Sequence, residues 1–593
     1  MSKRNIYGKY SLLLVEIILL FYVMGKYMEN NFFYAALSGI NVLSFLILCH
    51  TIKKYLDFDY WQEYVFIFFC LLFSVFPFCI NDFFYYDDLW SFSNQGISMV
   101  GIALQRPFID LYANVMSPLE YGRTSFFRIL LMIVQYVFAI SFYTYLREKS
   151  IGRLMGVFFS VFISCNVLVV DFLGYLSIFP VILSNLYIFY AYNSWREYLN
   201  EKVRSKLFIG VVLFISGCMH YPIIAPVIFG FILIDVVFEH MSKIKILYHM
   251  LMYGIGMLLY LLLTKSILAL FDMPISKRAM VVSSHEGILF KLNWFLFDVV
   301  PSTLNHFLTC FSSNLLTKYN CMFYTIEFNN GVITNVLCVI FISSVAFVCY
   351  KFYRETQYFF CFYVLGSMPL SFMFWLILDE STILTYYTYP LFLSIGIIFF
   401  IAVWYVLRNC NLRTMYSRNV IIVLILSIIV SSNVYASNFW VKYNSSGYEF
   451  IRNTISANIN DNIKHIHIYG KLNPMQINTY AVMATKLILR DMNLNYDDYK
   501  ITASDNDAIL SGMTCDEKER LYSNLSEEQK KVFDDNYIPN EKYPVYYLKP
   551  KERAENDFIA IKDMLISGGA LPEKNDSTII VDLNKGFVKF NQF

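Results

Sequence analysis

Long apolar stretches separated by short basic loops recur along the first three quarters of the chain. A helix needs about 17 to 25 mostly apolar residues to cross a bilayer, and these stretches have that length. Of the 593 residues, 57% are hydrophobic and only 16% are charged. Soluble domains carry about 25% charged residues. We therefore predict a polytopic α-helical membrane protein with about 13 transmembrane helices.

The basic residues of the short loops predict which helix ends face the cytoplasm, and Lys3 and Arg4 place the N-terminus inside. The predicted spans lie near 11–27, 32–50, 63–80, 125–146, 154–173, 175–193, 246–271, 332–350, 358–378, 385–407 and 419–436. Within 207–238 we expect two short or broken helices that meet at His220, because Pro222 prevents normal helical bonding there. The outer loops are then 81–124 and 272–331.

The composition changes near residue 437, where Asn, Asp, Lys and Glu become abundant. We predict a transmembrane domain over 1–436 and an extracytoplasmic α/β domain over 437–593, an ordinary domain size. Strands are expected at 465–469, 545–548 and 578–582, with a helix over 476–492. His465 and His467 alternate on the first strand without further ligands, so no metal site is expected.

Two adjacent carboxylates, Asp87 and Asp88, follow the span at 63–80 and lie in an aromatic-rich outer segment. Repulsion and desolvation favour a raised pKa for at least one of them, toward that of a general base. The alternative is a solvated acidic loop. Because the flanking residues are large and apolar, a position at the lipid boundary is predicted, where ionised carboxylates are costly unless partnered or functional. The neighbouring Tyr86 and Trp90 are candidate substrate-binding residues.

Basic residues on the predicted outer face are the candidates for holding a phosphate. Arg106 runs against the positive-inside tendency, and its guanidinium offers a fork for phosphate oxygens. Snorkelling or a salt bridge to Asp110 is the alternative. Lys277 and Arg278 form a second basic spot, for substrate phosphate or lipid head groups.

The predicted helix break supplies two further candidates. His220 and Tyr221 face outward there, either to bind donor phosphate or sugar, or to satisfy backbone groups that the break leaves unpaired.

The order of these motifs resembles the serotype-converting O-antigen glucosyltransferase family of bacterial membrane proteins. An apolar span is followed by Asp87-Asp88, then by Arg106-Pro107 and by Ser117-Pro118-Leu119 ahead of the next span. The family commonly has Arg where this chain has Ser91, and Gly where it has Gln105. The resemblance covers roughly residues 81–125, and beyond them it is architectural.

The resemblance implies a GT-C-type glycosyltransferase of the bacterial inner membrane. Its donor would be a polyprenyl-phosphate-linked sugar, such as undecaprenyl-phosphate-glucose, and its acceptor lipid-linked O-antigen or another surface glycan. A carboxylate would take the proton from the acceptor hydroxyl, while a cation stabilises the departing lipid phosphate. Single displacement predicts inversion of the anomeric configuration. No cofactor or metal is expected, and the net charge of +2 excludes a dense basic face for nucleic acid.

Three alternatives remain open from the sequence. An O-antigen polymerase also has many spans and large outer loops. A transporter or flippase would carry polar groups at mid-membrane, where Glu16 is the clearest acid. The C-terminal domain could also act as a binding or anchoring module beside an inactive membrane part.

Overall fold

The structure of the protein is a computed structural model. It describes residues 32–83, 105–109, 112, 123–174, 176, 180–270, 285–309, 331–354, 358–373, 376, 388–409, 415–469, 478–504, 537–539, 546–548 and 577–583. The chain forms two compact units. The first ends at Asn438, and the second begins at Phe439 and also includes Asp82, Phe83, Arg123 and Thr124.

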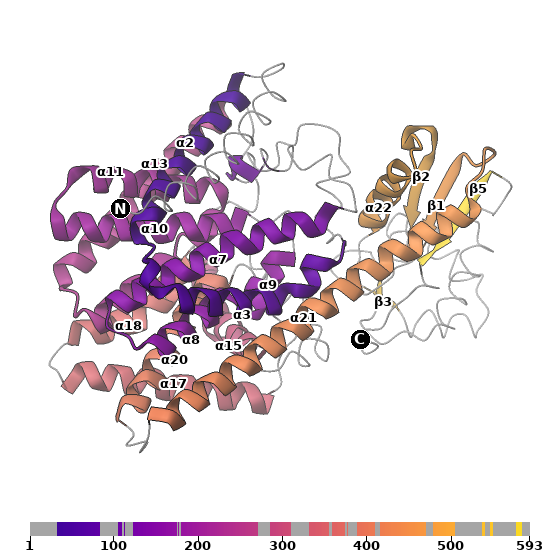
Figure 1. Cartoon of the computed structure of the whole chain (residues 1–593). Coiled ribbons are helices and arrows are strands. Elements are labelled where there is room, and N and C mark those ends of the chain that lie inside the picture. The colour runs from indigo at the N-terminus through magenta and orange to yellow at the C-terminus, as the bar shows by residue number, and fades with distance from the viewer. Residues whose placement is uncertain are drawn as a thin grey trace. The chain divides into compact units, whose positions relative to one another are not determined.

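The first unit is built from helices (Figure 1). Its N-terminal part contains α2 (Phe32–Tyr55), η1 (Phe58–Tyr60), α3 (Trp61–Ile80), α7 (Thr124–Glu148), α8 (Arg153–Ser164), α9 (Val167–Gly174), α10 (Pro180–Glu201), α11 (Arg204–His220), η4 (Pro222–Ile224), α12 (Val227–Phe238) and α13 (Lys243–Leu270). Its C-terminal part contains α14 (His285–Trp294), the π-helical turn η6 (Phe295–Val299), α15 (Val300–Thr309), α17 (Gly331–Arg354), α18 (Tyr358–Ser371), α20 (Tyr389–Asn409) and the beginning of α21 (Met415–Asn458).

Seven described helical segments are long and apolar enough to cross a membrane. They are Phe58–Ile80, Thr124–Glu148, Pro222–Glu239, Lys243–Ala269, Asn335–Arg354, Tyr389–Val406 and Asn419–Asn458. The pair α8 and α9, bent by 52°, qualifies as an eighth if it is one broken span. Exposed leucines such as Leu251, Leu258 and Leu262 cover one side of α13, as expected of a helix that faces lipid. The chain is a polytopic helical membrane protein.

The basic residues between the helices gather at one end of the first unit. Glu197 of α10 binds Lys54 of α2 at 2.8 Å and Lys206 of α11 at 2.6 Å. Glu63 of α3 lies 3.5 Å from Arg153 of α8. The loops with Lys54, Arg153 and Lys206, which the sequence predicts on one side of the membrane, therefore lie at one end of the helices. We call this end the basic end. Because α3 begins here and α11 ends away from it, Ile80 and His220 lie at the opposite end.

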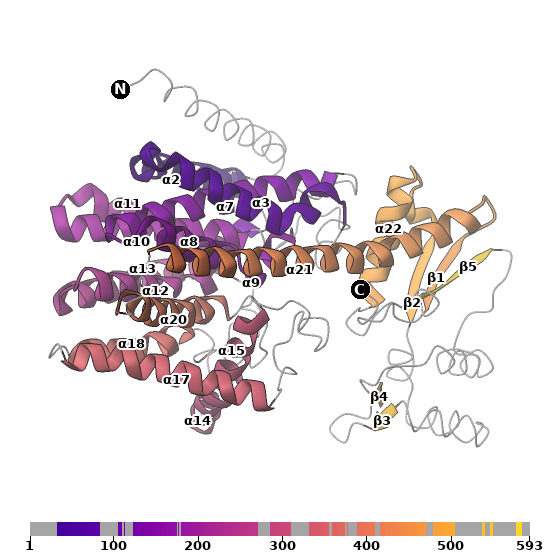
Figure 2. The same ribbon diagram turned by 60° about the horizontal axis from the view of Figure 1, so that its bottom comes forward.

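Helix α10 lies at the centre of the first unit, and nearly all its residues are buried. It packs against α2, α11, α12 and α13, while α17, α18 and α20 pack together beyond α12 (Figure 2). Two glycines of α11 permit the close approach to α10. A Cβ on Gly210 would lie 2.3 Å from the Trp195 ring, and one on Gly217 would lie 2.9 Å from Ile188.

The break at His220 is confirmed: α11 ends there, η4 begins at Pro222 and α12 at Val227. The helix that contains the last predicted span, α21, does not end at residue 436 but continues to Asn458. No proline interrupts it, and buried apolar residues follow a helical spacing beyond the expected boundary, at Tyr448, Ile451 and Ile455. The sequence becomes more polar after residue 436, but the helix continues through this change of composition.

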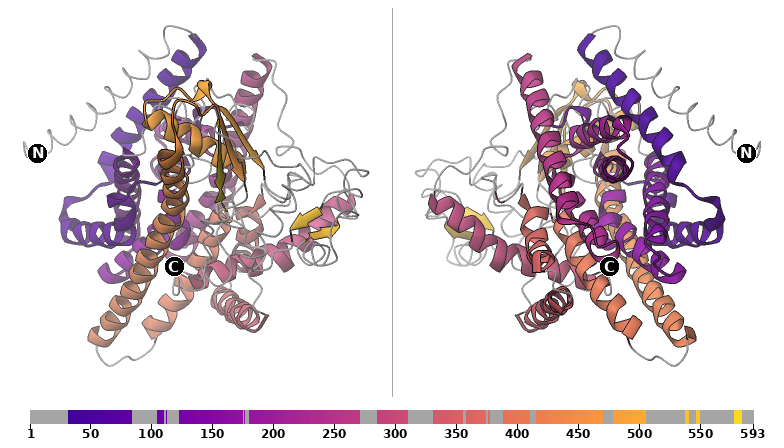
Figure 3. Two further views of the ribbon diagram at one scale, coloured as in Figure 1. Left: turned by 90° about the vertical axis from the view of Figure 1, so that its right-hand side faces the viewer. Right: turned by 90° about the vertical axis from the view of Figure 1, so that its left-hand side faces the viewer.

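The second unit contains a three-stranded parallel sheet in the order β2-β1-β5. Its strands are β1 (His465–Tyr469), β2 (Lys500–Ser504) and β5 (Thr578–Asp582), drawn side by side in Figure 3. Helix α22 (Asn478–Asp491) connects β1 to β2, as a parallel pair requires. A separate antiparallel pair joins β3 (Tyr537–Pro539) and β4 (Tyr546–Leu548). The predicted strands and helix are present, whereas β2 and β3 were not predicted.

Candidate functional site at the end of α11

The structure brings together three residues that the sequence singled out: Arg106, His220 and Tyr221. They meet at the end of α11 away from the basic end. The other predicted site residues lie outside the described residues. These are Asp87, Asp88, Tyr86, Trp90, Lys277 and Arg278.

Arg106 lies over the aromatic ring of Tyr221, with its Cζ atom 4.1 Å from the ring centroid. Tyr221 is almost fully buried, whereas Arg106 is partly exposed. A cation over an aromatic face is attracted by the ring quadrupole, more strongly where water is excluded. The contact therefore fixes a guanidinium at the surface of this helix end.

The backbone before Arg106 has an uncommon conformation. Gln105 has a φ of 60°, in the left-handed region that a residue with a Cβ rarely adopts. The Tyr260 hydroxyl of α13 donates to the Gln105 carbonyl at 2.5 Å and holds this turn. A short helical turn follows at 107–109.

His220 is fully buried, and both of its ring nitrogens have partners. Nδ1 lies 2.7 Å from the Ser216 carbonyl oxygen, which only accepts, so Nδ1 carries the proton. In the neutral ring Nε2 then accepts from the Tyr112 hydroxyl at 2.9 Å. This pattern satisfies the end of α11 and positions Tyr112.

Further polar groups extend the network toward α2 and α10. The Asn41 amide donates to the Tyr112 oxygen at 2.9 Å. The Tyr187 ring stacks on His220 with 5.0 Å between the centroids, and its hydroxyl lies 3.2 Å from the Ser44 hydroxyl. Sequence reasoning missed Asn41, Tyr112 and Tyr187. Nothing local marks them, because Tyr112 and Tyr187 contact His220, and Asn41 contacts Tyr112, from segments far away in the chain.

A second polar cluster lies at the basic end and was also missed. Asp235 of α12 is fully buried, pairs with Lys149 at 2.5 Å and accepts hydrogen bonds from Tyr145 and Tyr192. Arg196 lies 3.9 Å from the same carboxylate. The signal was one acid inside an apolar run, which by default marks a functional or paired group.

In the second unit, His465 Nε2 and His467 Nδ1 each lie 2.7 Å from the Thr502 hydroxyl of β2. Burial is the main cause that lowers the pKa of His467, to about 4, and the neighbouring His465 adds to it. Among the described residues, no group of three or more His, Cys, Asp or Glu side chains has the arrangement of a metal site.

No protein-family model and no curated protein of similar sequence matches the chain. Any function therefore has to be argued from the residues themselves.

Proposed function

We propose that the protein is a membrane glycosyltransferase that moves a hexose, with glucose as the first candidate, from a polyprenyl-phosphate-linked donor to lipid-linked O-antigen or another surface glycan. One observation carries this proposal: Arg106 is fixed over Tyr221 at the end of α11, on the same side of the first unit as the end of α3, after which the sequence contains Asp87 and Asp88. Helix α3 ends at Ile80, and the described chain resumes at Gln105 beside this arginine. The segment in between contains both acids.

The chemistry follows from the residue types. A donor whose leaving group is a lipid phosphate develops negative charge on that phosphate as the sugar departs. Arg106 would stabilise this charge, with Tyr221 holding the guanidinium in place. Asp87 or Asp88 would take the proton from the attacking hydroxyl. A single displacement of this kind inverts the anomeric configuration.

We also propose that the membrane part is a GT-C-like domain with about thirteen spans, located in the bacterial inner membrane. It is supported by helices at every predicted span between residues 32 and 436, including α2, α10, α11 and α18. Placing the basic end in the cytoplasm follows the positive-inside rule and puts Arg106 on the outer face. An extracytoplasmic C-terminal domain is part of the same proposal.

The test uses membranes that contain the full-length protein and a radiolabelled polyprenyl-phosphate sugar, with glucose as the first sugar tried. We expect release of polyprenyl phosphate together with a labelled glycan. Asp87→Asn, Asp88→Asn and Arg106→Gln should lower the rate, one of the aspartate variants at least 100-fold. Asp59→Asn, an exposed acid at the basic end, serves as the control. Normal rates in both aspartate variants would refute the assignment of the base, and an inert wild-type protein with every donor would refute the function.

A transporter is the second candidate, favoured by the buried charges of Asp235, Lys149 and Arg196. Asp235 lies only three residues before the end of α12, near one helix end rather than midway along it. Uptake of a labelled lipid-linked sugar without its consumption by the wild-type protein would support this reading instead.

A further inference from the structure

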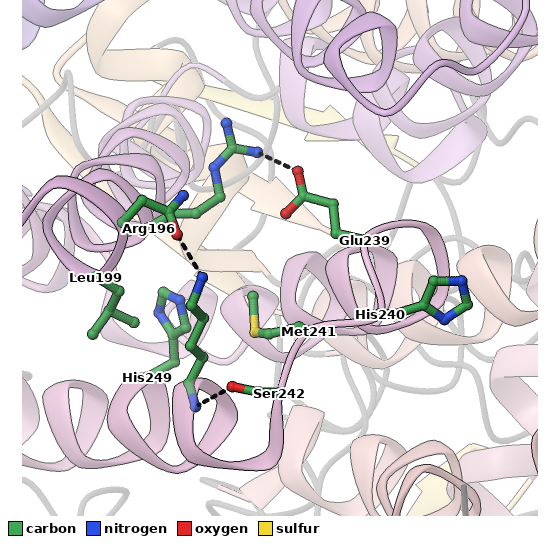
Figure 4. A pocket seen from close by; sticks show the side chains of 9 residues that line it. Arg196, Leu199, Glu239, His240, Met241, Ser242 and His249 are labelled. Carbon is green, nitrogen blue, oxygen red and sulfur yellow. Dashed lines mark hydrogen bonds and ion pairs between the residues drawn. The ribbon is translucent and has the colours of Figure 1, made fainter. Parts of the chain in front are cut away.

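A cavity of about 230 Å³ lies at the basic end, on the other side of the first unit's helices from Arg106. By the usual measure, a buried water needs roughly 10 to 15 Å³, so the cavity has room for a polyatomic group. Its lining includes Arg196, Asn200, Glu239, Ser242, Lys245 and His249. Figure 4 shows His240 directed away from the group formed by Arg196, Met241 and His249.

His249 of α13 is the most informative residue of the lining. The residue has no exposed surface, yet among the described residues neither ring nitrogen has a hydrogen-bond partner. Its ring packs against Tyr192 with 4.9 Å between the centroids. Buried polar atoms are almost always satisfied, because leaving one without a partner is costly. A buried imidazole that borders a cavity with both nitrogens unsatisfied therefore points to a ligand in that cavity.

Arg196 of α10 supplies a second donor that is not fully used. One terminal nitrogen, Nη2, binds Glu148. The other, Nη1, lies 3.9 Å from an oxygen of Asp235 and from one of Glu239, which is too long for a hydrogen bond. Among the described residues Nη1 has no hydrogen-bond partner. The guanidinium is thus held in position while part of its fork remains available to the cavity.

The remaining wall also favours an anion. Lys245 donates through Nζ to Asn200 Oδ1 at 2.6 Å, which leaves two further ammonium hydrogens. Ser242 lies directly before the N-terminus of α13, where the helix dipole favours negative charge. Glu239 is the one acidic lining residue, and it pairs with Lys149, which it shares with Asp235.

We propose that this cavity binds a phosphate group, through Arg196, Lys245 and His249. The donor set suits the oxygens of a phosphate, and its place at a helix end allows the group to be part of a lipid head group or of a soluble phosphate. The site goes beyond the proposed glycosyl transfer. The cavity lies at the basic end, where α11 begins, and His220 lies where α11 ends. The 17 residues of this helix place the two sites about 25 Å apart along the helix axis.

The first experiment measures binding of inorganic phosphate to the purified full-length protein in detergent. Labelled phosphate is followed by equilibrium dialysis, and the thermal midpoint is followed with phosphate against chloride at constant ionic strength. We expect saturable binding and a raised midpoint for the wild-type protein. Lys245→Gln and His249→Leu should each weaken binding about tenfold or more, because each removes a charged or buried donor.

The matched control is Lys202→Gln. Lys202 is an exposed lysine at the same end, outside the cavity lining, and its replacement changes the net charge by the same amount as Lys245→Gln. It should bind phosphate within twofold of the wild-type protein. An equal loss in the control would show that only the general positive potential is involved, and would overturn the proposal.

A lipid arm separates the two sources of the phosphate. Phosphatidylglycerol and a diacyl glycolipid without phosphate are added to the detergent-solubilised protein, and retained lipid is counted by native mass spectrometry. Retention of phosphatidylglycerol alone, lost in His249→Leu and kept in Lys202→Gln, assigns a lipid head group. Binding of inorganic phosphate with the same variant pattern assigns a soluble phosphate. A wild-type protein that retains neither probe overturns the proposal without reference to any variant's folding.

Discussion

The Arg106 guanidinium and the Tyr221 ring are stacked, with 4.1 Å between Cζ and the ring centroid. The two residues are more than one hundred positions apart in the sequence. The contact therefore depends on the packing of the short turn at 105–109 against the end of α11. A cation held in this way keeps one orientation, which a flexible surface arginine does not.

We predict that the stack is needed for donor binding. Tyr221→Leu removes the aromatic face and should raise the KM for the polyprenyl-phosphate sugar roughly 2- to 30-fold, the range of a cation–π contact of about 0.5 to 2 kcal/mol. Tyr221→Phe keeps the face and should stay near the wild-type KM. The measurement is the initial rate against donor concentration. Equal values for Leu and Phe would show that the ring does not act through Arg106.

The turn at Gln105 leads to a second prediction. This residue has a φ of 60°, a backbone conformation that glycine adopts more readily than residues with a Cβ. Gln105→Gly removes a strain of about 1 to 2 kcal/mol but adds freedom to the unfolded chain, so the thermal midpoint should be unchanged or higher. Gln105→Val, with a branched Cβ, should lower the midpoint. Thermal unfolding in detergent compares the two variants, and a lower midpoint for glycine than for valine would contradict the argument.

The comparison of sequence and structure shows which features local patterns determine. Pro222 predicted the break after His220, and the alternation in 465–469 predicted β1. The contacts of His220 with Tyr112 and of Asp235 with Lys149 were not predictable. Each joins residues more than eighty positions apart, and their meeting depends on how the chain at Tyr112 packs on α11 and how the turn after α7 packs on α12. The end of α21 was missed for another reason, since polar residues are compatible with a continuing helix.

Close packing of α10 on α11 makes Gly210 sensitive to added volume. A Cβ there would lie 2.3 Å from the Trp195 ring and 3.1 Å from the Ala191 carbonyl oxygen. This oxygen belongs to the backbone of α10 and cannot move aside as a flexible side chain could. Gly210→Ala should lower the free energy of unfolding by about 1 to 3 kcal/mol. Gly254→Ala on α13 is the control, because its Cβ meets nothing within 4 Å. Equal midpoints for the two variants in a thermal unfolding assay would refute the packing argument.

The buried pair of Asp235 and Lys149 should be needed for folding of the first unit. Both side chains are fully buried, so Asp235→Asn leaves a buried ammonium whose remaining acidic partner among the described residues is Glu239. Breaking such a pair costs about 3 to 5 kcal/mol. Glu239→Gln should cost less, because Glu239 is partly exposed. The yield of monodisperse protein and its thermal midpoint measure the difference, and an Asp235→Asn variant as stable as Glu239→Gln would contradict the prediction.

The stability of the second unit should depend on pH through His467. Its pKa of about 4 in the fold lies below the ordinary value of 6.5, chiefly because of burial. Between these two values the unfolded chain binds a proton that the folded sheet does not, so stability is complete above pH 6.5 and falls as the pH drops toward 4. We expect a loss of about 2 kcal/mol across this window, less than the full shift implies, because water still reaches part of the ring. Hydrogen exchange of the β1 amides, corrected for intrinsic rates, measures it. His467→Gln should flatten the dependence and the exposed His50→Gln should leave it unchanged, whereas an unchanged slope in His467→Gln would assign the effect to another group.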